Sequence, residues 1–82
     1  MIKMLTGSNC PACTMLKNRF EAIGLGHVYS QLDIESEEGT NLARAQGIRS
    51  IPVLVKFEGD SVVDTLTGAS HTIPKYKEFL LD

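Results

Sequence analysis

The N-terminal stretch MIKMLTGSNCPACTMLKNRFEAI, residues 1–23, decides the fold. Residues 1–6 are mostly apolar and end at a Gly-Ser pair, which predicts a short β-strand followed by a turn. From residue 11 to about residue 23, apolar side chains recur every three or four positions, which predicts an amphipathic helix. Cys10 and Cys13 therefore lie where a strand passes into the first turn of a helix.

Both ends of this predicted helix carry suitable residues. Pro11 fits the first position, where no backbone hydrogen bond is lost, and Gly24 fits the end. The polar side of the helix carries Lys17, Asn18, Arg19 and Glu21. Cys13 belongs instead to the apolar stripe that includes Leu16, so its side chain points into the protein. Cys10 lies outside that stripe and is expected to be exposed.

The rest of the chain alternates between strand-like and helix-like patterns. We expect strands at residues 28–34, 51–57 and 62–66, a hairpin turn at residues 58–60, and helices at residues 37–46 and 73–81. Ser36 and Thr40 are alternative N-caps for the first of these helices, and Thr72 suits the second. The order βαβαββα begins with a parallel βαβ unit, and crossover handedness places its helix and the next one on opposite faces. The sequence therefore predicts an α/β fold in one domain, residues 1–82.

The composition agrees with a small folded domain. Of the 82 residues, 43% are hydrophobic and 22% charged, which is too apolar for a disordered protein. The net charge of -2 argues against binding to nucleic acid or to an anionic membrane, since both select a basic face. No apolar run approaches the roughly 20 residues of a membrane span, and residues 1–6 are too short for a signal-peptide core. We therefore expect a monomer in the cytoplasm.

Cys10 and Cys13 are the only cysteines in the chain. Their helical spacing places the two Cα atoms about 5–6 Å apart, which suits a disulfide. Closing so short a loop stabilises a fold by only about 2 kcal/mol, so the bond contributes little to folding. In a reducing compartment this spacing favours a redox-active disulfide that is made and broken.

The position of Cys10 favours its thiolate. Unpaired N–H groups at a helix N-terminus favour an anion by about 0.3–2 kcal/mol, which lowers the pKa of a thiol from its usual value near 8.5. The first twenty residues contain Lys3, Lys17 and Arg19 and no acid. Cys10 is therefore the predicted nucleophile, and Cys13 is the predicted resolving thiol.

Other uses of the cysteine pair stay open at this stage. Two thiolates form half of a tetrahedral zinc site, which needs four ligands. The other candidates are His27 and His71, each alone in its segment. A metal ion shared between two chains and a purely structural pair of buried thiols are the remaining alternatives.

A proline at the start of the predicted third strand removes a ladder hydrogen bond. One interpretation of Ile51-Pro52 is a proline at an edge or first position, with the common trans peptide bond. The other is a cis bond that turns the strand start toward the cysteine loop. That arrangement leaves the backbone of Ile51 free to pair with a substrate.

Four stretches of the chain together resemble the thioredoxin and glutaredoxin family. They are residues 9–13 (NCPAC), 31–35 (QLDIE), 47–54 (GIRSIPVL) and 59–69. The resemblance covers essentially the whole chain. It implies a thioredoxin-like fold, with a four-stranded mixed sheet of order 2-1-3-4, three flanking helices and a cis Pro52 facing the disulfide. It also implies a substrate groove lined by Asn9, Pro11, Ala12, Ser50, Ile51, Pro52, Gly68 and Ala69.

The chain departs from both branches of this family. Thioredoxins carry a tryptophan before the first cysteine, whereas this chain has Asn9 and a Cys-Pro-x-Cys motif nearer to glutaredoxins. The buried Asp and Lys that assist the resolving thiol in thioredoxins fall here on Met4 and Gln31. Glutaredoxins hold glutathione with a basic residue before the first cysteine and a late Gly-Gly-x-acid segment. Residues 6–9 (TGSN) and 68–70 (GAS) supply neither.

The resemblance implies a dithiol oxidoreductase that reduces disulfide bonds in proteins, with ribonucleotide reductase as one candidate substrate. An NADPH-dependent thioredoxin reductase or glutathione would recycle it, and no cofactor is expected beyond the Cys10–Cys13 disulfide. One alternative is a glutathione-dependent glutaredoxin. The other is a non-enzymatic module that holds zinc or an iron–sulfur cluster between chains through the same two cysteines.

Overall fold

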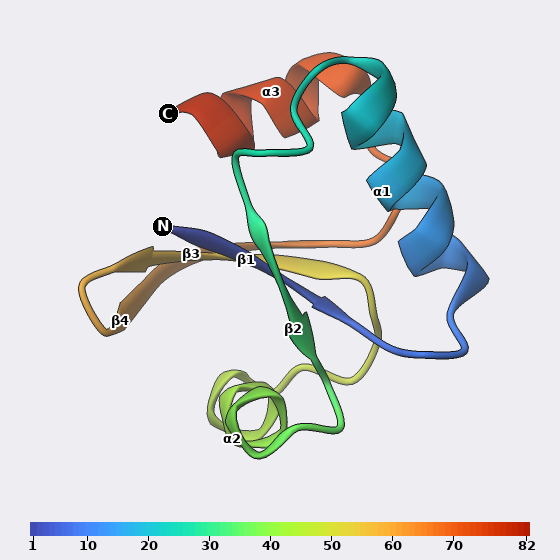
Figure 1. Cartoon of the computed structure of the whole chain (residues 1–82). Helices are drawn as coiled ribbons and strands as arrows, with labels where there is room; N and C mark the ends of the chain where they lie inside the picture. Colours follow the sequence, from blue (N-terminus) through green and yellow to red (C-terminus); the bar gives the residue numbers. More distant parts are fainter.

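A mixed sheet of four strands lies between two layers of helices (Figure 1). The computed structural model describes residues 1–82. The strands are β1 (Ile2–Thr6), β2 (Ser30–Asp33), β3 (Val53–Glu58) and β4 (Ser61–Thr67), and the helices are α1 (Pro11–Ala22), α2 (Glu37–Gln46) and α3 (Ile73–Leu81). The strand order β2-β1-β3-β4 and the predicted α/β class are confirmed. None of the helices is long and apolar enough to cross a membrane.

Strand β1 lies in the middle of the sheet, and its carboxyl end leads into the cysteine loop, residues 7–10. It pairs in parallel with β2 and antiparallel with β3, and β3 forms an antiparallel hairpin with β4. The hairpin turns at Gly59, whose φ of 63° suits a residue without a Cβ. Because both neighbours of β1 are hydrogen-bonded to it, the sheet fixes where the chain leaves β1 toward Cys10.

Two strands begin two residues later than the sequence predicts, and the other strand ends agree within one residue. Strand β2 is shorter than the predicted residues 28–34 because Val28 and Tyr29 pack against the core around α1 instead of extending the strand. Strand β3 begins at Val53, two residues later than predicted. Pro52 has no N–H to give to the ladder, so pairing starts only after it.

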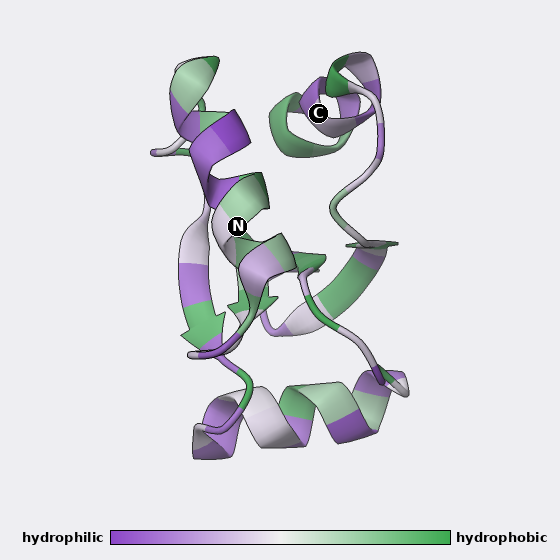
Figure 2. Ribbon diagram, turned by 90° about the vertical axis from the view of Figure 1, so that its right-hand side faces the viewer, coloured by the Kyte–Doolittle hydropathy of each residue, from purple (hydrophilic) through white to green (hydrophobic).

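The helices divide between the two faces of the sheet, with α1 and α3 on one face and α2 on the other (Figures 1 and 2). Side chains alternate along β1, as in any strand. Ile2 and Met4 face α1 and α3, where they join a cluster of nine buried residues. Leu5 faces α2 and packs with Val53 and Val55 in a cluster of three. The larger core therefore lies on the side of the cysteine-bearing helix.

Helix caps settle the starts of α2 and α3. The Ser36 hydroxyl accepts the Gly39 N–H at 3.0 Å, while the Thr40 hydroxyl donates to the Ile34 carbonyl at 3.0 Å. Ser36 is therefore the N-cap of α2. Thr72 caps α3 as predicted, by accepting the Lys75 N–H at 3.3 Å.

Candidate active site

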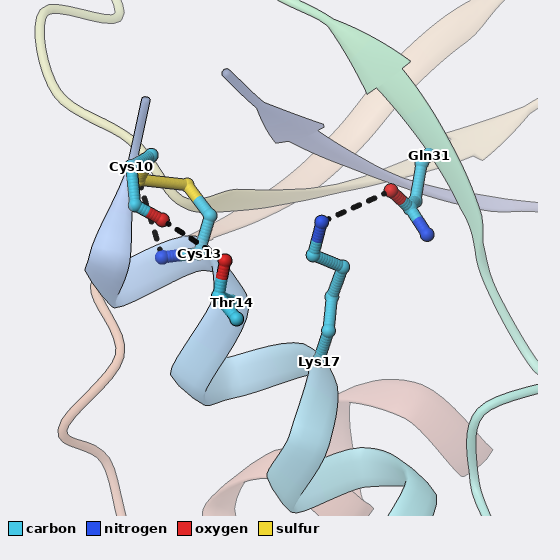
Figure 3. The surroundings of a disulfide bond; sticks show 5 residues. All are labelled: Cys10, Cys13, Thr14, Lys17 and Gln31. Atoms are coloured by element: carbon cyan, nitrogen blue, oxygen red, sulfur yellow. Dashed lines mark hydrogen bonds between the residues drawn. A yellow bond between two sulfur atoms is a disulfide. The ribbon is translucent and has the colours of Figure 1, made fainter. Parts of the chain in front are cut away.

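Cys10 and Cys13 are joined by a disulfide at the N-terminus of α1 (Figure 3). Their Cα atoms are 5.3 Å apart, within the range expected from helical spacing. Cys10 is the N-cap, with an extended backbone, and its carbonyl accepts the Thr14 N–H at 3.2 Å. The Cys13 N–H donates to the Cys10 sulfur at 3.1 Å. The sulfur of Cys10 thus occupies the position that an N-cap oxygen usually takes.

The two sulfurs differ in their access to solvent. Cys10 is half-buried, whereas the Cys13 side chain is 0% exposed. Cys13 lies on the buried stripe of α1 with Leu16 and Phe20, which is the orientation that the apolar periodicity predicts. An incoming group can therefore reach Cys10 but not Cys13.

The segment that precedes β3 lies against the loop before the cysteines. The Ile51–Pro52 peptide bond is cis. A Cβ atom placed on Gly7 would come 2.8 Å from Cδ1 of Ile51, so the cysteine loop and Ile51 pack closely. The Gly68 N–H donates to the Pro52 carbonyl at 2.9 Å. These contacts bring three distant segments together at one edge of the sheet.

The residues expected to line the groove have different exposures. Asn9, Pro11 and Ser50 are exposed. Ala12, Ile51 and Gly68 are half-buried, and Pro52 and Ala69 are buried. Beside Ile51 lies a cavity of about 370 Å³ that is lined by Ile34, Thr40, Ala43, Arg44, Ile48, Arg49, Ser50 and Ile51.

Arg19 holds the loop after β4, which sequence reasoning did not anticipate. Its guanidinium donates to the carbonyls of Ala69 at 2.8 Å and His71 at 3.1 Å, and it lies 5.3 Å from the centre of the Tyr76 ring. We expected Arg19 on the solvated side of α1. Its place three residues after buried Leu16, at the border of the apolar stripe, was the available signal. The loop that contains Gly68 and Ala69 is therefore anchored directly to the active-site helix.

Tyr76 completes this anchor from α3. Its hydroxyl donates to the Gly68 carbonyl at 2.8 Å and accepts the His71 N–H at 3.3 Å. Burial raises the pKa of Tyr76, while the His71 hydrogen bond and the Arg19 charge partly oppose the rise. Burial also raises the pKa of Tyr29, with a smaller contribution from Glu21. Both tyrosines pack edge-on against the ring of Phe20.

A second polar contact lies beside the disulfide. The Lys17 ammonium donates to the side-chain carbonyl of Gln31 at 3.3 Å, which links α1 to β2 (Figure 3). Met4 and Gln31, the two departures from the thioredoxin pattern, are register partners on adjacent strands. Met4 is fully buried, whereas Gln31 is exposed.

The histidines do not join the cysteines. His27 is exposed in the segment before β2. Nε2 of His71 lies 2.7 Å from the carbonyl oxygen of Thr67. No three His, Cys, Asp or Glu side chains of the chain lie close enough together to hold a metal ion.

Comparison with known proteins places the chain in a family. No family model matches it. Two proteins named glutaredoxin, from Neisseria meningitidis serogroups A and B, are 34% and 33% identical to it over 67 residues. Each match covers 80% of this chain and 76% of the glutaredoxin. The chain belongs to the glutaredoxin family.

Solved structures identify the fold of this family member independently. A thioredoxin from Thermus thermophilus superposes with a TM-score of 0.73 at 18% identity, over 98% of this chain and 69% of that one. The short form of spinach chloroplast thioredoxin f gives 0.72 at 24% identity, over 98% and 71%. The predicted thioredoxin-like fold is confirmed.

Family and geometry agree on the chemistry. Glutaredoxins and thioredoxins exchange electrons through a close pair of cysteines, and this chain carries such a pair at the N-terminus of α1. The chain is a thiol–disulfide oxidoreductase.

Proposed function

We propose that this glutaredoxin-family protein reduces disulfide bonds in protein substrates, with Cys10 as nucleophile and Cys13 as resolving thiol. The Cys10 thiolate attacks one sulfur of the substrate disulfide, forms a mixed disulfide and releases the first substrate thiolate. Cys13 then loses its proton and attacks the Cys10 sulfur. The Cys10–Cys13 disulfide forms, and the second substrate thiolate leaves. The unequal exposure of the two sulfurs carries this assignment.

The surroundings of Cys10 support its role as nucleophile. The Cys13 N–H already donates to the Cys10 sulfur in the disulfide, and the same bond would stabilise a thiolate in the reduced protein. A hydrogen bond to the charged form and the helix dipole both favour the thiolate of Cys10. The thiolate is the reactive species, so this position favours attack at neutral pH.

The edge beside the disulfide offers a path for an extended substrate segment. The backbone N–H and C=O of Ile51 make no backbone hydrogen bond within the chain. An extended peptide gains affinity by pairing with such free groups. We therefore place the substrate across Asn9, Pro11, Ala12, Ser50, Ile51, Pro52, Gly68 and Ala69, with its sulfur at Cys10.

Trapping tests the assignment of the two cysteines. With Cys13→Ser, the mixed disulfide at Cys10 has no resolving thiol, so covalent complexes with protein substrates accumulate. With Cys10→Ser, no complex forms because Cys13 is buried. Non-reducing electrophoresis of both variants with a disulfide-containing protein gives the result. Equal trapping by the two variants would reject the assignment.

The source of electrons separates two versions of this function. An NADPH-dependent thioredoxin reductase is the first candidate, and glutathione is the second. The second is favoured by the 34% identity to a glutaredoxin. Both donors occur in the reducing cytoplasm, where we expect the protein to act. The steady-state rate at which each donor reduces the oxidised protein distinguishes the two candidates. Rapid turnover with glutathione and none with the reductase would select glutathione.

A further inference from the structure

A polar depression of about 340 Å³ lies beside the first turns of α1. None of its lining residues is hydrophobic, and there is room for several water molecules. The depression is lined by Thr6, Gly7, Ser8, Lys17, Gln31 and Asp33. It therefore connects the carboxyl ends of β1 and β2 with the helix that carries Cys13.

Lys17 lies on α1 one helical turn after Cys13. It follows Cys13 by four residues and is half-buried, so it lies at the border of the buried stripe next to Cys13 and not on the solvated side that the sequence predicts. Helical side chains also lean toward the N-terminus. Its ammonium donates to Gln31 at 3.3 Å, which holds the side chain between α1 and β2 (Figure 3). A positive charge is thus fixed on the face of α1 that bears the buried sulfur.

Thr6 carries a buried hydroxyl that has no partner. The residue is 7% exposed, and its Oγ1 makes no hydrogen bond in the chain. Alternation along β1 places this side chain on the same face as Met4, toward α1. A buried hydroxyl without a partner is costly, so Thr6 is available to a water molecule.

Cys13 needs such support because it is fully buried. To resolve a mixed disulfide it must first lose its proton, and burial raises the pKa of a thiol. Met4, next to Gln31 in the sheet, has no ionisable group with which to help. The charged groups that line the depression are Lys17 from α1 and Asp33 from β2, and the Asp33 carboxylate accepts the Glu35 N–H at 2.8 Å.

We propose that Lys17, held in place by Gln31, supplies the positive charge that favours the Cys13 thiolate during resolution. This inference rests on the proposed function. In this step the Cys13 thiol gives its proton to a water molecule. Its sulfur then attacks Cys10, and the electron pair of the broken bond leaves with the substrate thiolate. Lys17 acts through its charge, and Gln31 is a positioning residue.

A two-phase reaction with an aromatic disulfide isolates the step. Reduced protein is mixed with one equivalent of 5,5′-dithiobis(2-nitrobenzoic acid), and the released aromatic thiolate is followed by stopped-flow absorbance. The first phase reports attack by Cys10, and the second reports resolution by Cys13. In Lys17→Met we expect the second phase to slow about tenfold at pH 7 and its pH midpoint to rise by about one unit. The first phase should stay within about twofold.

Matched variants separate charge from structure. Lys17→Arg keeps the charge and should restore the second phase. Lys77→Met removes an exposed lysine of α3 and should leave both phases unchanged. Gln31→Met, at an exposed position, should slow the second phase about two- to threefold, as expected for the loss of one hydrogen bond.

Two results would overturn the proposal. One is a second phase in Lys17→Met that stays within twofold of the parent at every pH. The other is an equal slowing of both phases, which would show that the charge acts on Cys10. Either result leaves the trapping experiment with Cys13→Ser unaffected, so the roles of the two cysteines are tested separately.

Discussion

The two faces of the sheet differ in the size of the buried apolar cluster that each one carries. On the face covered by α1 and α3, nine buried residues form one cluster, and the ring of Phe20 packs edge-on against both Tyr29 and Tyr76. On the face covered by α2, three buried residues are surrounded by half-buried ones. Cys13 projects from α1, on the side with the larger buried cluster.

This difference shows what the reaction needs from the fold. In the proposed mechanism the resolving sulfur must return to the same place after every cycle, and the cluster of nine buried residues around α1 holds its helix in position. The loop of Gly68 and Ala69 is tied to that same helix through Arg19. The α2 face covers the sheet without holding a reacting atom, and it therefore tolerates looser packing.

Removing the same side chain on each face gives the largest expected contrast. Leu16 on α1 is 0% exposed, whereas Leu42 on α2 is half-buried. A fully buried leucine loses about 2–5 kcal/mol on replacement by alanine, and a partly exposed one loses less because fewer contacts disappear. We expect the free energy of unfolding to fall by about 3–4 kcal/mol in Leu16→Ala and by about 1–2 kcal/mol in Leu42→Ala.

Urea denaturation of both variants, with the disulfide intact, measures the contrast. Equal losses in the two variants would show that the faces contribute alike, and the comparison would then fail. A changed slope of the transition would point to an altered unfolded state instead.

Alkaline pH should weaken the α1–α3 face first. Burial raises the pKa of both Tyr29 and Tyr76, so the unfolded chain ionises its tyrosines, with a pKa near 10, before the folded chain does. Their contribution to stability is complete below about pH 10 and declines as the pH rises above it. The double variant Tyr29→Phe and Tyr76→Phe should flatten this decline when the free energy of unfolding is followed from pH 8 to pH 11. A decline of unchanged steepness would assign the alkaline weakness to other groups.

Local patterns made much of this architecture predictable from sequence. The order of elements, the apolar stripe of α1 and the burial of Cys13 follow from periodicity within about a dozen residues. The N-cap position of Cys10 follows from the Gly-Ser turn and Pro11. The strand order came from the family resemblance, which summarises long-range pairing that no local pattern contains.

Contacts between distant segments were not predictable in this way. Arg19 bonds to carbonyls 50 and 52 residues away, so nothing near it in the sequence marks its partners. Lys17 and Gln31 are 14 residues apart and meet only because β2 lies beside β1. The start of β3 was misplaced because the apolar run continues through Ile51 and Pro52, although Pro52 cannot donate to the sheet.

The smallest effect should come from the ion pair on the α2 face. Lys3 of β1 pairs with Glu38 of α2, and their side chains are 23% and 61% exposed. Water and salt screen a pair of this kind, which contributes about 0–1 kcal/mol. We expect Glu38→Gln to lower the free energy of unfolding by less than about 1 kcal/mol at low salt, and to cause no measurable loss in about 1 M salt.

Glu37→Gln, on the same helical turn but without a partner, is the matched control in the same urea titration. A loss above about 2 kcal/mol that persists in high salt would mean that this pair anchors α2. The α2 face would then depend on a specific contact, as the loop held by Arg19 does, and not on loose apolar cover.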